Sequence, residues 1–243
     1  MPQTVSLSVV VPVKDEAGNA ASLAREIAAA LKDEGEFEIV FVDDGSSDET
    51  AAELLALRPE LPLRILKHAR NLGQSRALRT GVRAARAELI VTLDGDGQND
   101  PADIPKLIRA FEVEAANAAL GMVAGERVER KDTWRKRAAS RFGNGVRRAL
   151  LRDKGNDTGC SLKLFRRDTF LALPYFDHMH RYLIALMLRE GYDVRFVPVS
   201  HRPRGAGRSK YGVWDRALVG VRDIMGVMWL IRRFRGPAEI KEL

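Results

Sequence analysis

Short apolar runs alternate with amphipathic stretches through the first 124 residues, and this alternation constrains the fold more than any other feature. The apolar runs have the length and the β-branched or aromatic bias of strands, and they occupy residues 7–12, 37–42, 63–67, 88–93 and 119–124. Between them, apolar residues recur at helical spacing over 23–31, 49–57, 74–86 and 104–111. Strands and helices in this order form a parallel sheet with right-handed crossovers. The sequence therefore predicts an α/β fold, Rossmann-like, with a mostly parallel central sheet flanked by helices.

The length and composition fit a single large domain. The 243 residues are 45% hydrophobic and 30% charged, as in soluble globular proteins, and they contain no internal repeat or low-complexity linker. A further strand is expected at 195–199, so we predict one domain over 1–212 and a C-terminal helix and tail over 213–243. The one cysteine, Cys160, excludes an internal disulfide and a cysteine-rich metal site.

The charge is distributed unevenly along the chain. The whole chain carries 40 Lys and Arg against 33 Asp and Glu, a net charge of +7 that favours an anionic partner. Residues 1–100 have a net charge of −6, however, and residues 101–243 a net charge of +13. A uniformly basic surface that coats nucleic acid is therefore disfavoured. Since neither a signal sequence nor an apolar run of about 18 residues is present, we expect a cytoplasmic protein that does not span a membrane.

Acidic side chains follow two of the predicted strands. Asp94 and Asp96 come directly after the strand at 88–93, with Gln98 two residues further on. Ligands of parallel sheets bind at the carboxyl ends of the strands, and two carboxylates released into a Gly-containing turn can share one hard cation. We expect Mg²⁺ or Mn²⁺ there, with phosphate oxygens completing the coordination. An ordinary Gly-Asp turn is the alternative.

Asp43 and Asp44 end the strand at 37–42. They precede Ser46 to Glu49, and in this run Ser47 and Asp48 are predicted to cap the next helix. Two adjacent acids at a strand end also suit hydrogen bonds to a ribose or to a uracil-like base. The two roles are compatible.

Several motifs in this chain fall in the order found in one known family. The segments 10–16 (VVPVKDE), 42–50 (VDDGSSDET), 71–73 (NLG) and 93–98 (LDGDGQ) together resemble the family 2 glycosyltransferases, over roughly residues 5–212. The dolichyl-phosphate mannosyltransferase-like branch is the most similar. The resemblance implies a GT-A type fold. The chain departs from the family mildly, with Asp15 where Asn is usual and Gly95 where Ala is common.

The resemblance also assigns roles to the strand-end residues. It implies that Pro12, Asp15, Glu16, Asp43 and Asp44 bind the nucleotide of a sugar donor. It implies that Asp94, Asp96 and Gln98 bind the metal on the donor diphosphate.

The stretch 127–152 is strongly basic, with ten Lys and Arg against two acids. Apolar residues recur every four positions in it, which predicts an amphipathic helix whose cationic side either faces solvent or binds phosphates or anionic headgroups. In the similar family branch, the arginines of a G-x-R-x-x-R motif lie close to the phosphates. Arg127 and Arg130 are therefore candidates for donor binding.

Two further segments carry candidate residues. Residues 156–167 resemble the family segment whose aspartate lies at the acceptor, which makes Asp157 the candidate catalytic residue; a turn or helix cap is the alternative. Ser161, Leu162 and Lys163 stand where the family typically has a Phe-Arg pair. The Gly-rich basic loop 201–211 resembles the segment that folds over the diphosphate, although by itself it could bind nucleic acid. Its candidate donor-binding residues are Arg204, Ser209 and Lys210.

A long helix is predicted over 213–234, with the arginines Arg232, Arg233 and Arg235 at its end. Its apolar stripe comprises Val213, Trp214, Ala217, Leu218, Val221, Ile224, Met225 and Met228. Such a helix either packs in a core or a homo-oligomer, or lies on an anionic membrane with Trp214 and Trp229 at the interface.

These features predict a metal-dependent inverting glycosyltransferase at the cytoplasmic face of a membrane. It would move a hexose such as mannose or glucose from a GDP- or UDP-sugar to a polyprenyl phosphate. A soluble or protein acceptor is the alternative within the enzyme class. An aspartyl-phosphate phosphatase is disfavoured because its D-x-D motif usually lies on the first strand. A nucleic-acid or lipid-binding module is disfavoured because it leaves the strand-end acids unexplained.

Overall fold

A computed structural model of the chain describes residues 5–114, 116–128, 147, 150, 151, 153, 155, 157–203 and 213–236. Within these ranges, seven strands form one sheet in the order β3-β2-β1-β4-β6-β5-β7. The strands are β1 (Leu7–Val13), β2 (Phe37–Asp43), β3 (Leu63–Lys67), β4 (Leu89–Thr92), β5 (Leu120–Arg127), β6 (Lys163–Arg166) and β7 (Asp193–Val199). All neighbouring pairs are parallel except β6, which runs antiparallel to both β4 and β5. The predicted α/β class with a mostly parallel sheet is confirmed.

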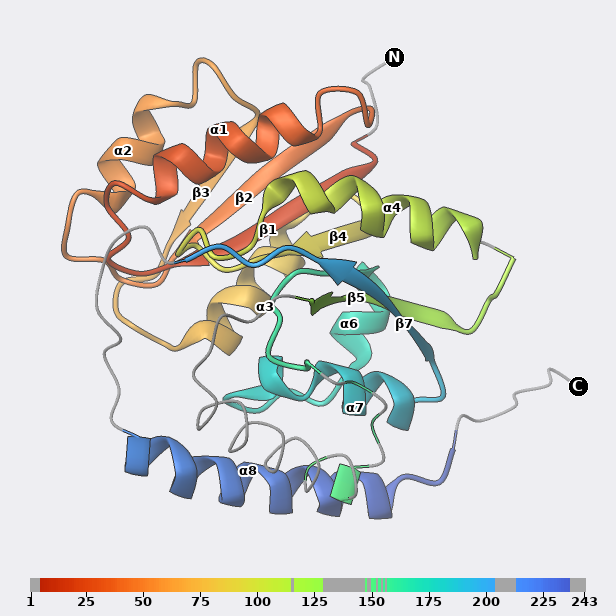
Figure 1. Cartoon of the computed structure of the whole chain (residues 1–243). Helices are drawn as coiled ribbons and strands as arrows, with labels where there is room; N and C mark the ends of the chain where they lie inside the picture. The colour runs from red at the N-terminus through yellow and green to blue at the C-terminus, as the bar shows by residue number, and fades with distance from the viewer. Residues whose placement is uncertain are drawn as a thin grey trace, which may run out of the picture.

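Helices cover both faces of the sheet (Figure 1). They are α1 (Ala20–Ala30), α2 (Thr50–Ala56), α3 (Gln74–Ala84), α4 (Ile104–Val113), α6 (Arg167–Ala172), α7 (Leu183–Arg189) and α8 (Val213–Arg233), with short 3-10 turns η1 (Pro101–Asp103) and η2 (Met179–Arg181). Helices α1, α2 and α4 lie on one face, and α3, α6 and α7 on the other, with α8 outermost beneath α7. The layers explain why the central strands are apolar at nearly every position.

The central strand β1 shows this two-sided burial directly. Val9 and Val11 pack into the core under α1 and α4, whereas Val10, between them, packs into the core with α3. All three side chains are fully buried. Side chains alternate between the faces of a strand, so a sheet covered on both faces needs a continuous apolar run.

Strand β6 is the main element that the sequence pattern does not reveal. It has four residues and begins with a lysine. Its next two residues, Leu164 and Phe165, pack into the cores on opposite faces of the sheet. Because β6 is antiparallel, its first residue, Lys163, lies at the edge where β4 and β5 end; it is paired with Thr92 and Ala124. The segment before β6 is thereby brought to the same edge as the acids after β4.

Helix α8 begins and ends within a residue of its predicted bounds. Val227 is fully buried on it, and Ile224, Met228 and Ile231 pack against the same core. Val221, Met225 and Trp229 form a separate row at 58%, 59% and 60% exposure. The predicted stripe is therefore divided: Ile224 and Met228 pack inward, whereas Val221 and Met225 face outward. The side chains of Val213, Trp214, Ala217 and Leu218 lie outside the described part of the chain.

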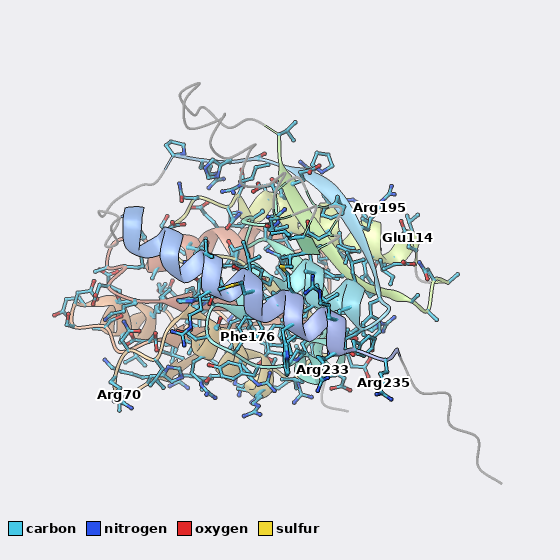
Figure 2. All side chains as sticks on the ribbon, turned by 90° about the horizontal axis from the view of Figure 1, so that it is seen from below. Arg70, Glu114, Phe176, Arg195, Arg233 and Arg235 are labelled. Carbon is cyan, nitrogen blue, oxygen red and sulfur yellow. The ribbon has the colours of Figure 1, made fainter. Side chains whose placement is uncertain are left out.

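Contacts with the body of the domain hold α8 in place. His178 Nδ1 lies 3.1 Å from Asp223 Oδ2, and Arg189 Nε donates to the Leu230 carbonyl at 3.1 Å. Figure 2, seen from below, shows α8 lying across this face of the molecule, with Arg233 and Arg235 at its end. Over the described residues, none of the helices has the length and apolar character needed to cross a membrane.

A buried carboxylate, Glu38, joins several elements near the amino ends of the strands, at the end of the sheet away from Asp43 and Asp94. Glu38 accepts hydrogen bonds from Ser8 Oγ (2.6 Å), Arg64 Nη1 (2.8 Å) and the Arg86 amide (2.6 Å). Burial alone raises the pKa of Glu38, but these donors outweigh burial and hold the pKa below its usual value. Glu38 thus joins β1, β2, β3 and the end of α3 as an ionised group.

We predict that Glu38→Gln lowers the free energy of unfolding at pH 7 by about 1–3 kcal/mol, since buried donors lose a charged acceptor. Because the folded-state pKa lies below the unfolded one, the stabilisation is present above about pH 4.3 and is lost as the pH falls through the folded value. Urea denaturation between pH 7 and pH 3 should therefore show the two proteins converging. The exposed neighbour variant Glu36→Gln should match the wild type throughout, and a pH-independent difference would contradict the role of the charge.

Candidate functional site

The D-x-D segment lies in a turn directly after β4. Its middle residue, Gly95, packs so closely on the end of β1 that an added Cβ would lie 2.5 Å from Val13 Cγ1 and 3.1 Å from the Pro12 carbonyl oxygen. The turn is therefore pressed against β1, and Asp94 and Asp96 lie beside the predicted nucleotide-binding residue Pro12. The small residue at 95 is required by this contact.

Asp94 is held by a side chain from a different element. Gln74 Nε2, at the start of α3, donates to Asp94 Oδ1 at 2.7 Å. Burial and the neighbouring Asp96 carboxylate raise the pKa of Asp94, and a hydrogen bond from Ser161 and the charge of Lys163 oppose this rise. Asp96 Oδ1 accepts the Gln98 amide at 3.1 Å. The two carboxylates thus repel each other in a partly buried turn.

This pair fits a divalent cation that shares its ligands with a phosphate. Over the described residues, no group of three or more His, Cys, Asp or Glu side chains is placed to hold a metal by itself. Mg²⁺ and similar cations are commonly held by one or two carboxylates together with substrate phosphates. A cation at Asp94 and Asp96 would also relieve the repulsion that raises the pKa of Asp94.

Asp43 and Asp44 lie at the end of β2 but differ in their surroundings. Asp43 is fully buried, accepts the Ser46 amide at 2.7 Å, and has its Oδ2 3.2 Å from Lys67 Nζ. Asp44 bonds to His68 Nδ1 at 2.7 Å and accepts the backbone amides of Leu72 and Gly73 at 2.9 and 2.8 Å. The Asp44 carboxylate is therefore occupied in fastening the loop before α3.

The segment after β1 is fastened to the segment after β2. Asp15 has a left-handed backbone (φ 51°), its amide donates to Ser46 Oγ, and its Oδ1 accepts the Ser47 amide at 2.9 Å. Among non-glycine residues, Asn and Asp tolerate this conformation best, which accounts for Asp in place of the usual Asn. The Glu16 amide donates to Thr50 Oγ1 at 2.9 Å. Asp15 and Glu16 thus lie at the same edge as Asp43.

The capping prediction for α2 is half right. Asp48 Oδ1 accepts the amide of Thr50, the first residue of the helix, at 3.1 Å, although the N-cap itself is Glu49, whose side chain makes no capping hydrogen bond. Ser47 does not cap the helix, because its hydroxyl donates instead to Asp15 Oδ1 at 3.2 Å. The serine is engaged in joining the two strand-end segments.

Arg127 and Asp157 form the second half of the site. Arg127 Nε donates to Asp157 Oδ2 at 2.5 Å, and Arg127 Nη2 donates to Asp157 Oδ1 at 2.7 Å. This bidentate pair is largely buried, with the two side chains 14% and 7% exposed, and the hydrogen bonds that Arg127 donates to Asp157 raise the pKa of Arg127. The candidate catalytic residue is therefore held by the candidate phosphate-binding arginine.

Lys163 lies in the middle of these groups and was not singled out from the sequence. It is 3% exposed, donates to the Cys160 carbonyl, and its pKa is lowered by burial, against the opposing charges of Cys160, Asp94 and Asp157. The adjacent strand-end segments are joined by Thr92 Oγ1, which donates to the Ser161 carbonyl at 2.8 Å. Lys163 and Gln74 are the two site residues that sequence reasoning missed.

The beginning of the predicted diphosphate loop closes one side of the site. His201 pairs with Asn99 through the backbone, and the Arg202 amide donates to the Gln98 carbonyl at 3.0 Å. Arg202 also donates to Asp100 Oδ1 at 2.6 Å and to Glu26. This segment thus lies against the turn that carries Asp94 and Asp96. The remaining candidates Arg130, Arg204, Ser209 and Lys210 lie outside the described residues, as does most of the helix predicted over 127–152.

Comparisons with known proteins show which family and fold this chain shares. The profile of the family described as Glycosyl transferase family 2 matches residues 8–173. A dodecaprenyl-phosphate galacturonate synthase of Rhizobium johnstonii is 34% identical over 236 residues, which are 95% of this chain and 68% of that protein. An undecaprenyl-phosphate 4-deoxy-4-formamido-L-arabinose transferase of Edwardsiella ictaluri is 35% identical over 210 residues, or 85% of this chain and 63% of that protein. This chain thus spans about two thirds of the length of these relatives.

Solved structures share the fold at low sequence identity. Glucosyl-3-phosphoglycerate synthase of Mycobacterium tuberculosis, in complex with Mn²⁺, UDP and glucosyl-3-phosphoglycerate, has a TM-score of 0.68 at 18% identity, over 97% of this chain and 82% of that one. Mannosyl-3-phosphoglycerate synthase of Rubrobacter xylanophilus has a TM-score of 0.71 at 14% identity, over 97% and 77% of the two chains. The predicted GT-A type fold is confirmed.

We predict that Gly95→Ala lowers the free energy of unfolding by about 1–3 kcal/mol, because the new methyl group overlaps Val13. Combined with Val13→Ala, the loss should be smaller than the sum of the two single losses by at least about 0.5 kcal/mol. Denaturant titrations of the four proteins of this cycle test the contact. As a control, Gly226→Ala on α8, where a Cβ meets no atom within 4 Å, should stabilise the protein slightly. A Gly95→Ala variant as stable as the wild type would show that Val13 moves away from the new methyl group without loss of stability.

Proposed function

The chain belongs to glycosyl transferase family 2, and on that premise we propose that it transfers a sugar from a UDP-sugar to a polyprenyl phosphate. The observation that carries the proposal is the meeting of two groups at one edge of the sheet: the Asp94 and Asp96 pair, and the Arg127–Asp157 pair. The first suits a cation on the donor diphosphate, and the second suits a phosphate of the donor or the acceptor. The named activities of the two relatives, both polyprenyl-phosphate sugar transferases, support the acceptor class. UDP and Mn²⁺ in the structure of similar fold support the donor.

In the proposed reaction, an oxygen of the acceptor phosphate attacks the anomeric carbon of the sugar. The new carbon–oxygen bond forms as the bond to the β-phosphate oxygen of the donor breaks, with inversion, and UDP leaves with the electron pair. The cation at Asp94 and Asp96, Mg²⁺ or Mn²⁺, would supply neutralisation of the charge on the departing diphosphate. Buried Asp43 lies at the edge where the nucleoside is expected.

The pairing of Asp157 with Arg127 defines what each residue does in this reaction. A phosphate acceptor is already ionised near neutral pH, so little deprotonation by a general base is needed. Asp157 is bidentately bonded to Arg127, which orients the planar guanidinium. We assign Asp157 to orienting Arg127 and the acceptor, and Arg127 to binding phosphate oxygens.

We predict that Asp96→Asn reduces sugar transfer by about 10²-fold or more, because one of the two proposed metal carboxylates is lost. In a thermal-shift assay, Mn²⁺ should increase the stabilisation by UDP in the wild type but not in the variant. The surface variant Asp33→Asn, at a side chain 84% exposed, serves as control and should behave as the wild type. The assay should include polyprenyl phosphate and soluble acceptors. Transfer to a soluble acceptor alone would contradict the acceptor class, and full Mn²⁺-dependent turnover by Asp96→Asn would contradict the metal site.

The outer row of α8 supports contact with an anionic membrane surface, where a polyprenyl phosphate resides. Val221, Met225 and Trp229 follow at intervals of four residues and are each more than half exposed. Arg222, Arg232, Arg233 and Arg235 are exposed on the same helix and its end, and Figure 2 shows Arg233 and Arg235 there. The Arg233 guanidinium lies 5.9 Å from the centre of the Trp229 ring. An apolar row bordered by arginines is typical of a helix that lies in the headgroup region.

We predict that replacing Val221, Met225 and Trp229 together by Ser weakens binding to vesicles of phosphatidylglycerol and phosphatidylcholine by at least about tenfold, because three apolar side chains no longer insert. Sedimentation with vesicles measures the affinity. A matched control replaces Leu55 and Val113, which are 50% and 85% exposed on α2 and α4 across the sheet, and should leave binding unchanged. Equal loss in both variants, or loss in neither, would contradict docking by α8.

A further inference from the structure

We propose that Gln74 is a positioning residue for the metal-binding carboxylate of Asp94, and that Asp44 acts on the same carboxylate through the loop 71–75. This inference rests on the proposed function and deepens it. It gives Asp44 a task different from the nucleotide contact that the family resemblance implies. It also connects two motifs, the acid pair after β2 and the D-x-D after β4, through a third motif, the Asn-Leu-Gly segment at 71–73.

The contact itself is short and chemically suited to the task. Gln74 Nε2 donates to Asp94 Oδ1 at 2.7 Å across the gap between α3 and the turn after β4. An amide is neutral, so it can fix the rotation of a carboxylate without competing with the cation for that carboxylate, as the positive charge of a lysine would. Gly95 and Gly97, the latter at φ 73°, make the turn that carries Asp94 rich in glycine. Support from outside the turn is therefore what sets the direction of this carboxylate.

Gln74 has no core of its own to hold it, because its side chain is exposed. Its position is set by the backbone of the loop, and Asp44 fixes that backbone. Asp44 Oδ1 accepts the Leu72 amide and Asp44 Oδ2 accepts the Gly73 amide, at 2.9 and 2.8 Å. Gly73 has φ 88°, a conformation that places α3 immediately after the anchored amides. The buried carboxylate of Asp44 thus determines where α3 begins.

A second anchor holds the loop from the other side. Ser75 is buried, and its hydroxyl lies 2.8 Å from His180 Nδ1, while the His180 amide donates back to Ser75 Oγ at 3.3 Å. Burial lowers the pKa of His180 to about 3, helped by the charges of Arg181, Lys163 and His178. His180 is therefore neutral at physiological pH, and the anchor does not change with pH in that range. Gln74 lies between two fixed points, Asp44 before it and His180 after it.

The test is Gln74→Leu, which keeps a similar volume and removes the donor. We expect its affinity for Mn²⁺ in the presence of saturating UDP to fall by about tenfold or more, the usual cost of losing a group that orients a metal ligand. Electron paramagnetic resonance of free Mn²⁺ measures this affinity. UDP binding without metal, measured by calorimetry, should stay within twofold of the wild type. Gln74→Asn, which restores an amide on a shorter side chain, should recover part of the loss.

Two comparisons separate this role from a general disturbance of the loop. Leu72→Ala removes an exposed side chain from the same loop and should leave Mn²⁺ affinity unchanged. Asp44→Asn, in a double-mutant cycle with Gln74→Leu, should show losses that combine to clearly less than their product, because both act on Asp94 through one loop. Losses that multiply would overturn the part assigned to Asp44.

The failure of this inference is distinguishable from failure of the proposed function. Wild-type affinity for Mn²⁺ in Gln74→Leu, with Mn²⁺ and UDP binding intact in the wild type, overturns the role of Gln74 alone. Absence of Mn²⁺ or UDP binding in the wild type overturns the proposed function, and the inference falls with it.

Discussion

Carboxylates from several strands meet at one edge of the sheet, and the rest of the structure depends on how their charges are compensated. Asp43 lies 3.2 Å from Lys67 Nζ, Asp44 bonds to His68 and two backbone amides, and Asp157 bonds to both ends of the Arg127 guanidinium. Asp94 differs from these, since the side chains that donate to it, Gln74 and Ser161, are neutral, and burial and the adjacent Asp96 raise its pKa. Protein groups thus neutralise the other carboxylates around the site, and under the proposed function a cation at the D-x-D pair would complete the balance.

The sequence pattern predicts the parts of this arrangement that depend on periodicity. The central strands β1, β2, β4 and β5 are apolar because they are buried on both faces, and the edge strands β3 and β7 are recognised by their β-branched residues and the turns that bound them. Parallel topology places Asp43 and Asp94 at one edge. Strand β6 escapes prediction because four residues beginning with a lysine carry no period, and only tertiary pairing makes them a strand. Gln74 escapes it because nothing local links an exposed glutamine on one helix to an aspartate twenty positions later. The contact exists only once α3 and β4 are packed on β1.

The C-terminal helix shows where periodicity stops being informative. A wide apolar stripe predicts that some of its residues pack against the domain and others stay exposed. It does not predict which residues are in each group. The neighbouring elements decide: α7 and the His178–Asp223 contact set the rotation of α8, so that Val227 is buried and Trp229 is not. The uneven charge of the chain has a counterpart in the described residues. Acids of the first half, such as Asp43 and Asp94, lie at the carboxyl ends of the strands, whereas Arg127 of the second half lies beside them and further arginines are exposed on α8.

The antiparallel strand β6 has a consequence for how the protein folds. The pairs that join β1 to β2 connect residues about thirty positions apart, such as Leu7 and Phe37, whereas β6 joins Arg166 to Leu89 and Phe165 to Met122. Closing longer loops costs more chain entropy before any contact compensates for it. The half of the sheet that carries Asp43 and Asp44 is therefore expected to assemble first, with β6 inserted late between β4 and β5. The segment that carries Asp157 directly precedes β6, so the Arg127–Asp157 pair is expected to form only once β6 has paired with β4 and β5.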